Sequence, residues 1–211
     1  MRYGRSKGRS RDSRSGRIVE QRTPRPAKVL ILCEGEKTEP NYFAAILEEL
    51  DLTNVVLIEG AAGDPLHLVR EASSRTAFET VWCVFDRDSF PADRFDNAVN
   101  ACDGKRLHAI WSNEAFELWY VLHFQYLDTG APGAKGNARS YYQERLKELL
   151  GTYAKNDLSM WGRLSEHLET ALRNADRLVA VHDVSTAPHD RLPMTRVGVL
   201  VRELLNYEQF R

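Results

Sequence analysis

Apolar residues along the first 125 positions follow two alternating patterns. Short runs rich in Val, Ile and Leu predict buried strands, and the longer segments between them carry apolar residues at helical spacing. A repeated strand–helix order is typical of a parallel sheet covered by helices with right-handed crossovers, so we expect an α/β fold. The predicted strands span residues 28–33, 54–60, 81–85 and 106–112, and the predicted helices span 40–51, 65–77, 92–104 and 114–124.

The pattern changes after about residue 125. A Gly- and Ala-rich segment, residues 129–140, is expected to be a mobile loop. We expect residues 126–211 to form a helical extension that packs on an α/β core of residues 28–125, instead of folding as an independent domain. Within this extension, helical spacing predicts helices at 140–155, 160–182 and 196–207, with an irregular segment at 184–195.

The first 27 residues form a separate, strongly basic segment. Residues 1–28 carry ten Lys or Arg residues and two acidic ones, whereas the whole chain has a formal net charge of −1. Large apolar residues are nearly absent there, so residues 1–27 are expected to be a disordered arm. Such an arm can neutralise nucleic-acid phosphates, and the alternative is a solubilising tail without a partner. The predicted nucleic-acid contacts are Arg5, Lys7, Arg9, Arg11, Arg14 and Arg17.

Length and composition indicate an ordinary soluble protein. The 211 residues are 43% hydrophobic and 28% charged, which suits one medium domain with an appendage. No apolar run approaches the ~20 residues of a membrane span and no signal-peptide pattern follows the start, so we expect a cytoplasmic protein without membrane contact. The three cysteines, Cys33, Cys83 and Cys102, form no CxxC pair and are expected to be small buried hydrophobes.

Two of the predicted strands end at carboxylates. Glu34 follows the first strand, and Asp86 and Asp88 follow the third. Ligands gather outside the carboxyl ends of strands in parallel sheets, and side chains two apart on an extended segment point the same way. Three converging carboxylates repel one another unless a cation holds them, and the sequence fixes no lysine beside them. This arrangement predicts a site for Mg²⁺, with Mn²⁺ as a substitute, and phosphate chemistry, whereas the alternative is that the aspartates cap the next helix.

The loop after the first strand adds further candidates. Gly35 lets the backbone turn sharply and lets a phosphate approach closely. Glu34 can complete the metal shell or act as the base that removes a proton from the nucleophile. Glu36 and Glu39 lie in the same loop and are candidate ligands for a second metal ion. The alternative role of Glu39 is to complement the dipole of the helix that follows.

Residues 112–117 lead into the fourth predicted helix. Ser112 or Asn113 is suited to cap a helix that begins at Glu114. Asn113 and Glu117 are four residues apart and would share a helix face that could orient water, phosphate or a second metal ion. Glu117 is therefore a candidate catalytic residue, and the alternative is a first-turn charge that complements the helix dipole.

Three blocks of the sequence together resemble a known family. A strand that ends in Glu-Gly, with a later strand that ends in Asp-x-Asp, resembles the Toprim pattern of type IA topoisomerases, bacterial primases and OLD-family nucleases. The fuller strings CEGEKTEPNYF, VWCVFDRD and SNEAFELWYVLHF are similar to the RloB-like family in particular. These blocks cover about residues 28–125, and the helical tail is also similar, although it is less distinctive.

The resemblance implies a Toprim fold and Mg²⁺-dependent phosphodiester chemistry, in a setting beside restriction or abortive-infection systems and often with an ABC-type ATPase partner. Carried over by position, Glu34 matches the Toprim glutamate, and Asp86 and Asp88 match the two metal-binding aspartates. OLD-type nucleases have a second glutamate soon after the first. The string here is one residue longer, so the match of Glu39 to that ligand stays open. The block that contains Glu117 is characteristic of the family, which favours a role in the site.

We therefore predict a Mg²⁺-dependent nuclease that acts on DNA or RNA in antiviral defence. The alternative from another class is a non-catalytic subunit that binds nucleic acid or an ATPase, and a third reading is hydrolysis of a small phosphoester. Lys135, Arg139 and Lys155 are candidates for contact with the scissile phosphate, with surface solvation as the alternative for each. His123 shares an apolar helix face with Trp119 and is expected to lie in the core.

Overall fold

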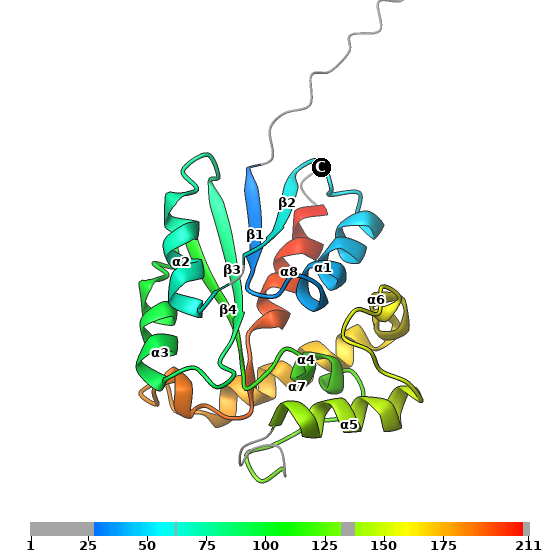
Figure 1. Cartoon of the computed structure of the whole chain (residues 1–211). Helices are drawn as coiled ribbons and strands as arrows, with labels where there is room; N and C mark the ends of the chain where they lie inside the picture. The colour runs from blue at the N-terminus through cyan, green and yellow to red at the C-terminus, as the bar shows by residue number, and fades with distance from the viewer. Residues whose placement is uncertain (1–27, 62, 132–137, 209–211) are drawn as a thin grey trace, which may run out of the picture.

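The computed structural model describes residues 28–61, 63–131 and 138–208 (Figure 1). The predicted nucleic-acid contacts Arg5 to Arg17, and Lys135 in the Gly- and Ala-rich segment, lie outside the described residues. Within the described ranges, no helix is long and apolar enough to cross a membrane.

A five-stranded sheet forms the centre of the fold. Its strands are β1 (Val29–Cys33), β2 (Val56–Gly60), β3 (Thr80–Asp86), β4 (Leu107–Asn113) and β5 (Met194–Thr195), in the order β2-β1-β3-β4-β5. Strands β1 to β4 are parallel, and each falls on one of the four apolar runs. The α/β prediction is confirmed, and the mostly parallel sheet with flanking helices is consistent with a Toprim-like fold.

The fifth strand corrects the prediction of an irregular segment at residues 184–195. This segment contains a short 3-10 helix, η3 (Pro188–Asp190), and then β5, which is antiparallel to the end of β4. The hydroxyl oxygens of Ser112 and Thr195 lie 3.0 Å apart across this pair. A two-residue strand has no periodicity for a sequence pattern to detect, so its partner in the sheet decides that it forms.

Helices cover both faces of the sheet (Figure 1). Helices α2 (Pro65–Ser74) and α3 (Ala92–Ala101) lie on one face, where the ring of Phe95 packs edge-on against Phe85 and Trp111. Helices α1 (Thr38–Glu49) and α8 (Val197–Glu208) lie on the other face. Because both faces are covered, all five side chains of β1 are buried.

A second group of helices lies beyond the carboxyl ends of the parallel strands (Figure 1). Helix α4 is at its centre, and all six of its residues are buried. The side-chain amide of Asn174 in α7 donates to the carbonyl of Leu122 at 2.8 Å, which holds α7 against the end of α4. The helices of this group are α4 (Glu117–Leu122), α5 (Ala138–Leu150), α6 (Met160–Leu164) and α7 (Leu168–Val181).

The predicted helix at 160–182 is interrupted. A 3-10 turn, η2 (Ser165–His167), separates α6 from α7. Trp161 of α6 packs against Tyr42 of α1 with ring centroids 5.7 Å apart, whereas α7 packs against α4. One straight helix would have to meet both partners along a single axis, so the turn redirects the chain. The continuous helical spacing of the sequence does not reveal these two partners.

An aromatic cluster joins α1 to α4. The indole N–H of Trp119 donates to the hydroxyl of Tyr42 at 2.8 Å, which satisfies both polar groups inside the core. His123 is 1% exposed and lies edge-on to Trp119, so its core placement is confirmed. Burial lowers the pKa of His123 to about 4. All three cysteines are free, and Cys33 and Cys83 are buried.

Candidate active site

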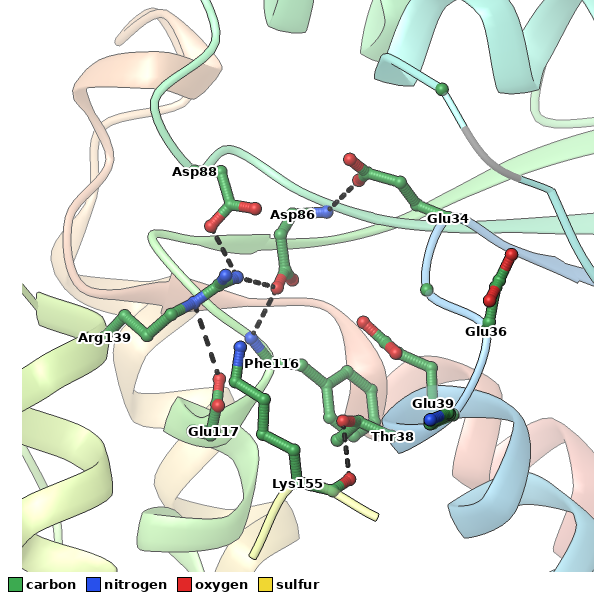
Figure 2. Close-up of a pocket in the computed structure, with 13 residues that line it drawn as sticks. Glu34, Glu36, Thr38, Glu39, Asp86, Asp88, Phe116, Glu117, Arg139 and Lys155 are labelled. Carbon is green, nitrogen blue, oxygen red and sulfur yellow. Dashed lines mark hydrogen bonds and ion pairs between the residues drawn. The ribbon is translucent and has the colours of Figure 1, made fainter.

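A cavity of about 430 Å³ opens where the ends of β1 and β3 meet α1, α4 and α5 (Figure 2). Its charged lining is mainly acidic, with twice as many carboxylates as cationic side chains. The cavity therefore gathers the predicted site residues from three separate parts of the chain. The acidic residues are Glu34, Glu36, Glu39, Asp86, Asp88 and Glu117, and the basic ones are Lys37, Arg139 and Lys155.

Asp86 ends β3 and is 5% exposed. Its Oδ2 accepts a hydrogen bond from the backbone N–H of Phe116 at 3.0 Å and another from Arg139 at 2.9 Å. The alternative that the aspartates cap the next helix is not seen, because Pro91 precedes α3 without a side-chain cap. The carboxylate instead ties β3 to the turn before α4 and faces the cavity.

Asp88 reaches the cavity by a different backbone path from the predicted one. The sequence predicts an extended Asp86–Asp88 segment, whereas Asp88 has a φ of 44°, in the left-handed region that aspartate tolerates better than most residues. Its N–H donates to the carbonyl of Glu114 at 3.1 Å. The two aspartates meet because both form ion pairs with Arg139, which corrects the reason given for their convergence.

Glu34 follows β1 and points toward the backbone of β3. Its carboxylate accepts from the N–H of Asp86 at 3.1 Å, so it lies beside the main chain of that aspartate (Figure 2). Burial raises the pKa of Glu34 to about 7, the hydrogen bond from Asp86 opposes this shift, and the charges of Asp88 and Glu39 add to it. Such a pKa is well placed for accepting a proton near neutral pH.

Glu39 occupies the first turn of α1, is 8% exposed and also lines the cavity. Glu39 can therefore complement the dipole of α1 and also serve as a metal ligand, since its place in the first turn of α1 is also a place in the cavity lining. Gly35 makes this placement possible: a Cβ at Gly35 would lie 2.2 Å from Oε2 of Glu39. Burial, with the charges of Glu117 and Asp88, raises the pKa of Glu39.

Glu117 is 3% exposed and lies on the opposite side of the cavity from Glu34 (Figure 2). Its Oε1 accepts from the amide of Gln143 at 2.8 Å and from the hydroxyl of Tyr153 at 3.1 Å. Its Oε2 is 3.9 Å from Nε of Arg139. Neutral donors on one oxygen and a guanidinium near the other hold this carboxylate in a fixed orientation.

The predicted capping role of Ser112 and Asn113 is wrong. Both residues belong to β4, and α4 begins only at Glu117. The amide nitrogen of Asn113 donates to the carbonyls of His189 at 2.8 Å and Arg191 at 3.0 Å, so Asn113 shares no helix face with Glu117. The N–H of Phe116, the residue before α4, donates to Asp86, so a carboxylate from β3 satisfies a backbone donor at the start of this helix.

The sequence names Arg139 as a candidate for phosphate contact, but it does not predict that Arg139 pairs with the carboxylates of the cavity. Arg139 lies in the first turn of α5, inside the segment predicted as a mobile loop, and its side chain is 29% exposed. The carboxylate of Glu114 accepts from the N–H of Ala138 at 3.3 Å, which anchors the start of α5 beside the cavity. Burial lowers the pKa of Arg139, whereas the charges of Asp86, Asp88 and the other carboxylates raise it. Their combined effect is larger, so the net shift of the pKa is upward. Surface solvation is therefore the wrong reading for Arg139.

Lys155 also reaches the cavity. The hydroxyl of Thr38, at the start of α1, donates to the carbonyl of Lys155 at 2.7 Å and holds this segment at the rim. The side chain extends inward (Figure 2), and its charge lowers the pKa of Asp88 against the larger raising effect of burial. Lys155 is thus a cation near the carboxylates, and not only a surface residue.

The carboxylates of the cavity are poorly compensated. Burial, together with mutual repulsion, raises the pKa values of Asp86 and Asp88, and the charge of Arg139 offsets only part of this. Across the described part of the chain, no group of three His, Cys, Asp or Glu side chains is arranged to hold a metal ion. The reason lies in the geometry: Arg139 stands between Asp86, Asp88 and Glu117, and Glu34 is turned to the backbone. The donors themselves, all carboxylate oxygens, fit a hard cation such as Mg²⁺ once Arg139 moves aside.

A family model described as RloB-like protein matches residues 29–204. The chain belongs to the RloB-like family. The match spans the sheet, the helices beyond it and every residue of the cavity. Neither the curated proteins nor the solved structures contain a significant match to this chain.

Proposed function

We propose that this RloB-like protein is a Mg²⁺-dependent nuclease that hydrolyses phosphodiester bonds in DNA or RNA. The observation that carries the proposal is the cavity at the carboxyl ends of the strands, where buried carboxylates from β3, α1 and α4 surround one arginine. Uncompensated carboxylates beside cationic side chains suit a site that binds a divalent metal and a phosphate together.

Asp86 and Asp88 are the proposed principal metal ligands, with Glu34 completing the shell and Glu39 available for a second ion. Mn²⁺ can substitute, since it accepts the same oxygen donors. When bound, the metal polarises the phosphate and lowers the pKa of a bound water. If a metal ion took the place of Arg139 beside the aspartates, its guanidinium would be available to bind a phosphate in the same cavity.

The proton transfers are assigned to side chains of the cavity. Oxygen of water forms a bond to phosphorus while the bond from phosphorus to the leaving oxygen breaks. Glu34 would accept the proton of the attacking water in the arrangement where it does not bind the metal ion, and its pKa of about 7 in the metal-free site favours this role over that of a ligand. Lys155, which lines the cavity, is the proposed donor of a proton to the leaving oxygen. Glu117, which accepts from Gln143 and Tyr153, is proposed to orient Arg139.

The test is incubation of the purified protein with plasmid DNA, single-stranded DNA and total tRNA, each with Mg²⁺, Mn²⁺ or EDTA. Asp88→Asn is the matched inactive variant, because the amide keeps the shape and removes the charge. Asp93→Asn, at an exposed acid in the first turn of α3, is the control. We expect metal-dependent cutting by the wild type and the control, and a loss of at least ~10²-fold in Asp88→Asn. Equal cutting by Asp88→Asn and the wild type would contradict the assignment.

The second candidate function is a non-catalytic subunit that binds nucleic acid or an ATPase. The ion pairs of Arg139 with Asp86 and Asp88 favour it, since they neutralise these carboxylates without a metal. Metal titration followed by thermal melting separates the two functions. Stabilisation by Mg²⁺ or Mn²⁺ that is lost in Asp86→Asn supports the enzyme, and no stabilisation supports the binding subunit.

The setting of the activity is also part of the proposal. The family resemblance favours antiviral defence in the cytoplasm together with an ABC-type ATPase, and the basic arm at residues 1–27 is proposed to contact nucleic-acid phosphates. Cleavage assays with and without a co-encoded ATPase test the partner. Hydrolysis of a small phosphoester, with no cutting of DNA or RNA, would shift the substrate class and leave the metal site intact.

A further inference from the structure

A second cavity, of about 510 Å³, lies at the outer edge of β4, away from the carboxylates. It is enclosed by α3, by the end of β4 and by the segment that carries η3, which runs beside α3 (Figure 1). The exposed residues Asn100 and Ser185 line it, so it is open to solvent. Two arginines, Arg191 and Arg196, supply its positive charge.

Arg196 is half-buried, and its guanidinium lies apart from the acids of the described residues. Its backbone N–H donates to the carbonyl of Trp111 at 2.8 Å, which fixes the residue against β4. Among the residues that the structure describes, no carboxylate forms an ion pair with the guanidinium of Arg196. Burial, and then the charge of Arg191, lowers the pKa of Arg196. A partly desolvated cation without a counter-charge is costly, so the site favours an anion from outside the chain.

The surrounding groups leave the positive charge available. The guanidinium of Arg191 donates to the carbonyls of Thr186 at 2.8 Å and Val184 at 2.7 Å, which shapes the loop without neutralising the charge. Asp96 is the one acid in the described lining, and it accepts from both the N–H and the ring Nδ1 of His189. Hydrogen bonds from Ser185, and with them the charge of Arg191, lower the pKa of Asp183 in the same loop. Among the described residues, Arg196 is therefore the cation of this cavity whose charge no nearby acid offsets.

The backbone of the second cavity lies two strands away from Asp86 of the first cavity. Asp86 is in register with Ser112, and Ser112 is in register with Thr195, the residue before Arg196. Two interstrand spacings separate the backbones of Asp86 and Thr195, which is ~10 Å. Successive phosphates of one strand in a duplex advance by about 3.4 Å along the helix axis, so a strand of several nucleotides is longer than this separation.

We propose that Arg196 and Arg191 bind a backbone phosphate of the nucleic acid whose cleavage is proposed above. That the phosphate belongs to nucleic acid rests on that proposed function. The anion site itself rests on Arg196, which lines an open cavity and forms no ion pair within the described residues, and on Arg191 beside it. Without metal, the carboxylates of the first cavity outnumber its cationic side chains, so a cationic contact outside it would strengthen binding of a nucleic acid. Arginine suits this contact because its planar fork donates to two phosphate oxygens at once.

The experiment measures binding of a fluorescein-labelled single-stranded oligonucleotide to the full chain in EDTA, at several salt concentrations. Arg196→Met keeps the apolar stem and removes the charge, Arg196→Lys keeps the charge, and Arg173→Met is the matched control at an exposed arginine of α7. We expect Arg196→Met to reduce the magnitude of the slope of log K against log salt by about 0.7, which weakens binding about fivefold at 0.1 M salt. Arg196→Lys should retain most of the slope, and Arg173→Met all of it.

Two thermal-melting measurements complete the test. Inorganic phosphate should raise the melting temperature of the wild type more than that of Arg196→Met. Without phosphate, Arg196→Met should melt no lower than the wild type, whereas a purely structural role for Arg196 predicts a lower melting temperature. Unchanged salt slope with lost phosphate stabilisation would overturn the nucleic-acid assignment in favour of a small phosphate compound. Unchanged slope and unchanged phosphate stabilisation would overturn the site altogether.

These measurements are independent of catalysis, because EDTA removes divalent metal. If Arg196 contributes to the salt slope but no substrate is cut with Mg²⁺, the nuclease proposal fails and the phosphate site stands. If the protein cuts nucleic acid but Arg196→Met keeps the full slope, the phosphate site fails and the nuclease proposal stands.

Discussion

The guanidinium of Arg139 donates to Oδ2 of Asp86 at 2.9 Å, although 53 residues separate the two in sequence. The same guanidinium forms an ion pair with Asp88. One cation therefore faces two carboxylates whose pKa values are raised by burial, and it offsets only part of that shift. The arginine occupies the position between the aspartates that the metal is proposed to take, so guanidinium and metal compete for the same oxygens.

Replacing Arg139 by Gln tests this competition. Without metal at neutral pH, the variant should lose about 2 kcal/mol of stability, because breaking a partly buried ion pair leaves its carboxylates uncompensated. Added Mg²⁺ should then raise the melting temperature of Arg139→Gln more than that of the wild type. Arg145→Gln, in the same helix but bound to Gln125 and Glu148, is the control. An identical response to Mg²⁺ in Arg139→Gln and the wild type would show that guanidinium and metal occupy different places.

The pKa of Glu34 predicts a pH dependence of stability in EDTA. The carboxyl group has a pKa of about 7 in the folded protein and an ordinary value of 4.5, so between these values the folded state binds more protons than the unfolded state. Stability must therefore fall as pH rises through this window, by about 3 kcal/mol for this group. His123 has its pKa lowered to about 4 and acts in the opposite direction, so the comparison needs a variant.

Glu34→Gln provides that comparison. Urea unfolding of the wild type and the variant at pH 5 and pH 8 isolates the contribution of Glu34, since His123 is unchanged in both. The variant should lose less stability than the wild type between the two pH values. The same loss in both proteins would mean that Glu34 has an ordinary pKa.

Gly35→Ala is expected to disturb the site without unfolding the chain. The added Cβ would lie 2.2 Å from Oε2 of Glu39, and because that atom ends a flexible side chain, the carboxylate should move away. We expect a change of under about 1 kcal/mol in stability, with weaker stabilisation by Mg²⁺ or Mn²⁺. Gly162→Ala, where a Cβ meets nothing within 4 Å, is the matched control. Metal stabilisation equal to that of the wild type would argue against Glu39 as a ligand.

Asn113→Asp tests whether Asn113 has a structural role or a role in metal binding. The amide of Asn113 donates to the carbonyls of His189 and Arg191, and a carboxylate there would face acceptors with no proton to give. The free energy of unfolding should fall by about 3 kcal/mol, and the melting temperature with it. At low temperature, the remaining folded protein should still respond to Mg²⁺. A stable variant without metal response would instead place Asn113 in the metal site.

The sequence alone determined the α/β core and most of the acidic half of the site. The composition of the apolar runs at β1 to β4 predicts strands that are buried on both faces. Acids at the carboxyl ends of β1 and β3 must then lie at the same edge of a parallel sheet. Glu34, Asp86 and Asp88 were located for that reason. Glu117 was located by its place in a family block, and not by the helix-face argument, which the structure contradicts.

Tertiary structure alone decided which cation meets these acids. Arg139 is brought to Asp86 because Glu114 anchors the start of α5, and no local pattern encodes a contact across 53 residues. The same limit applies to Asn113, whose partners lie in the segment before β5, and to the break between α6 and α7. Periodicity reports which face of an element is apolar, whereas the partner of a polar group depends on how distant elements pack together.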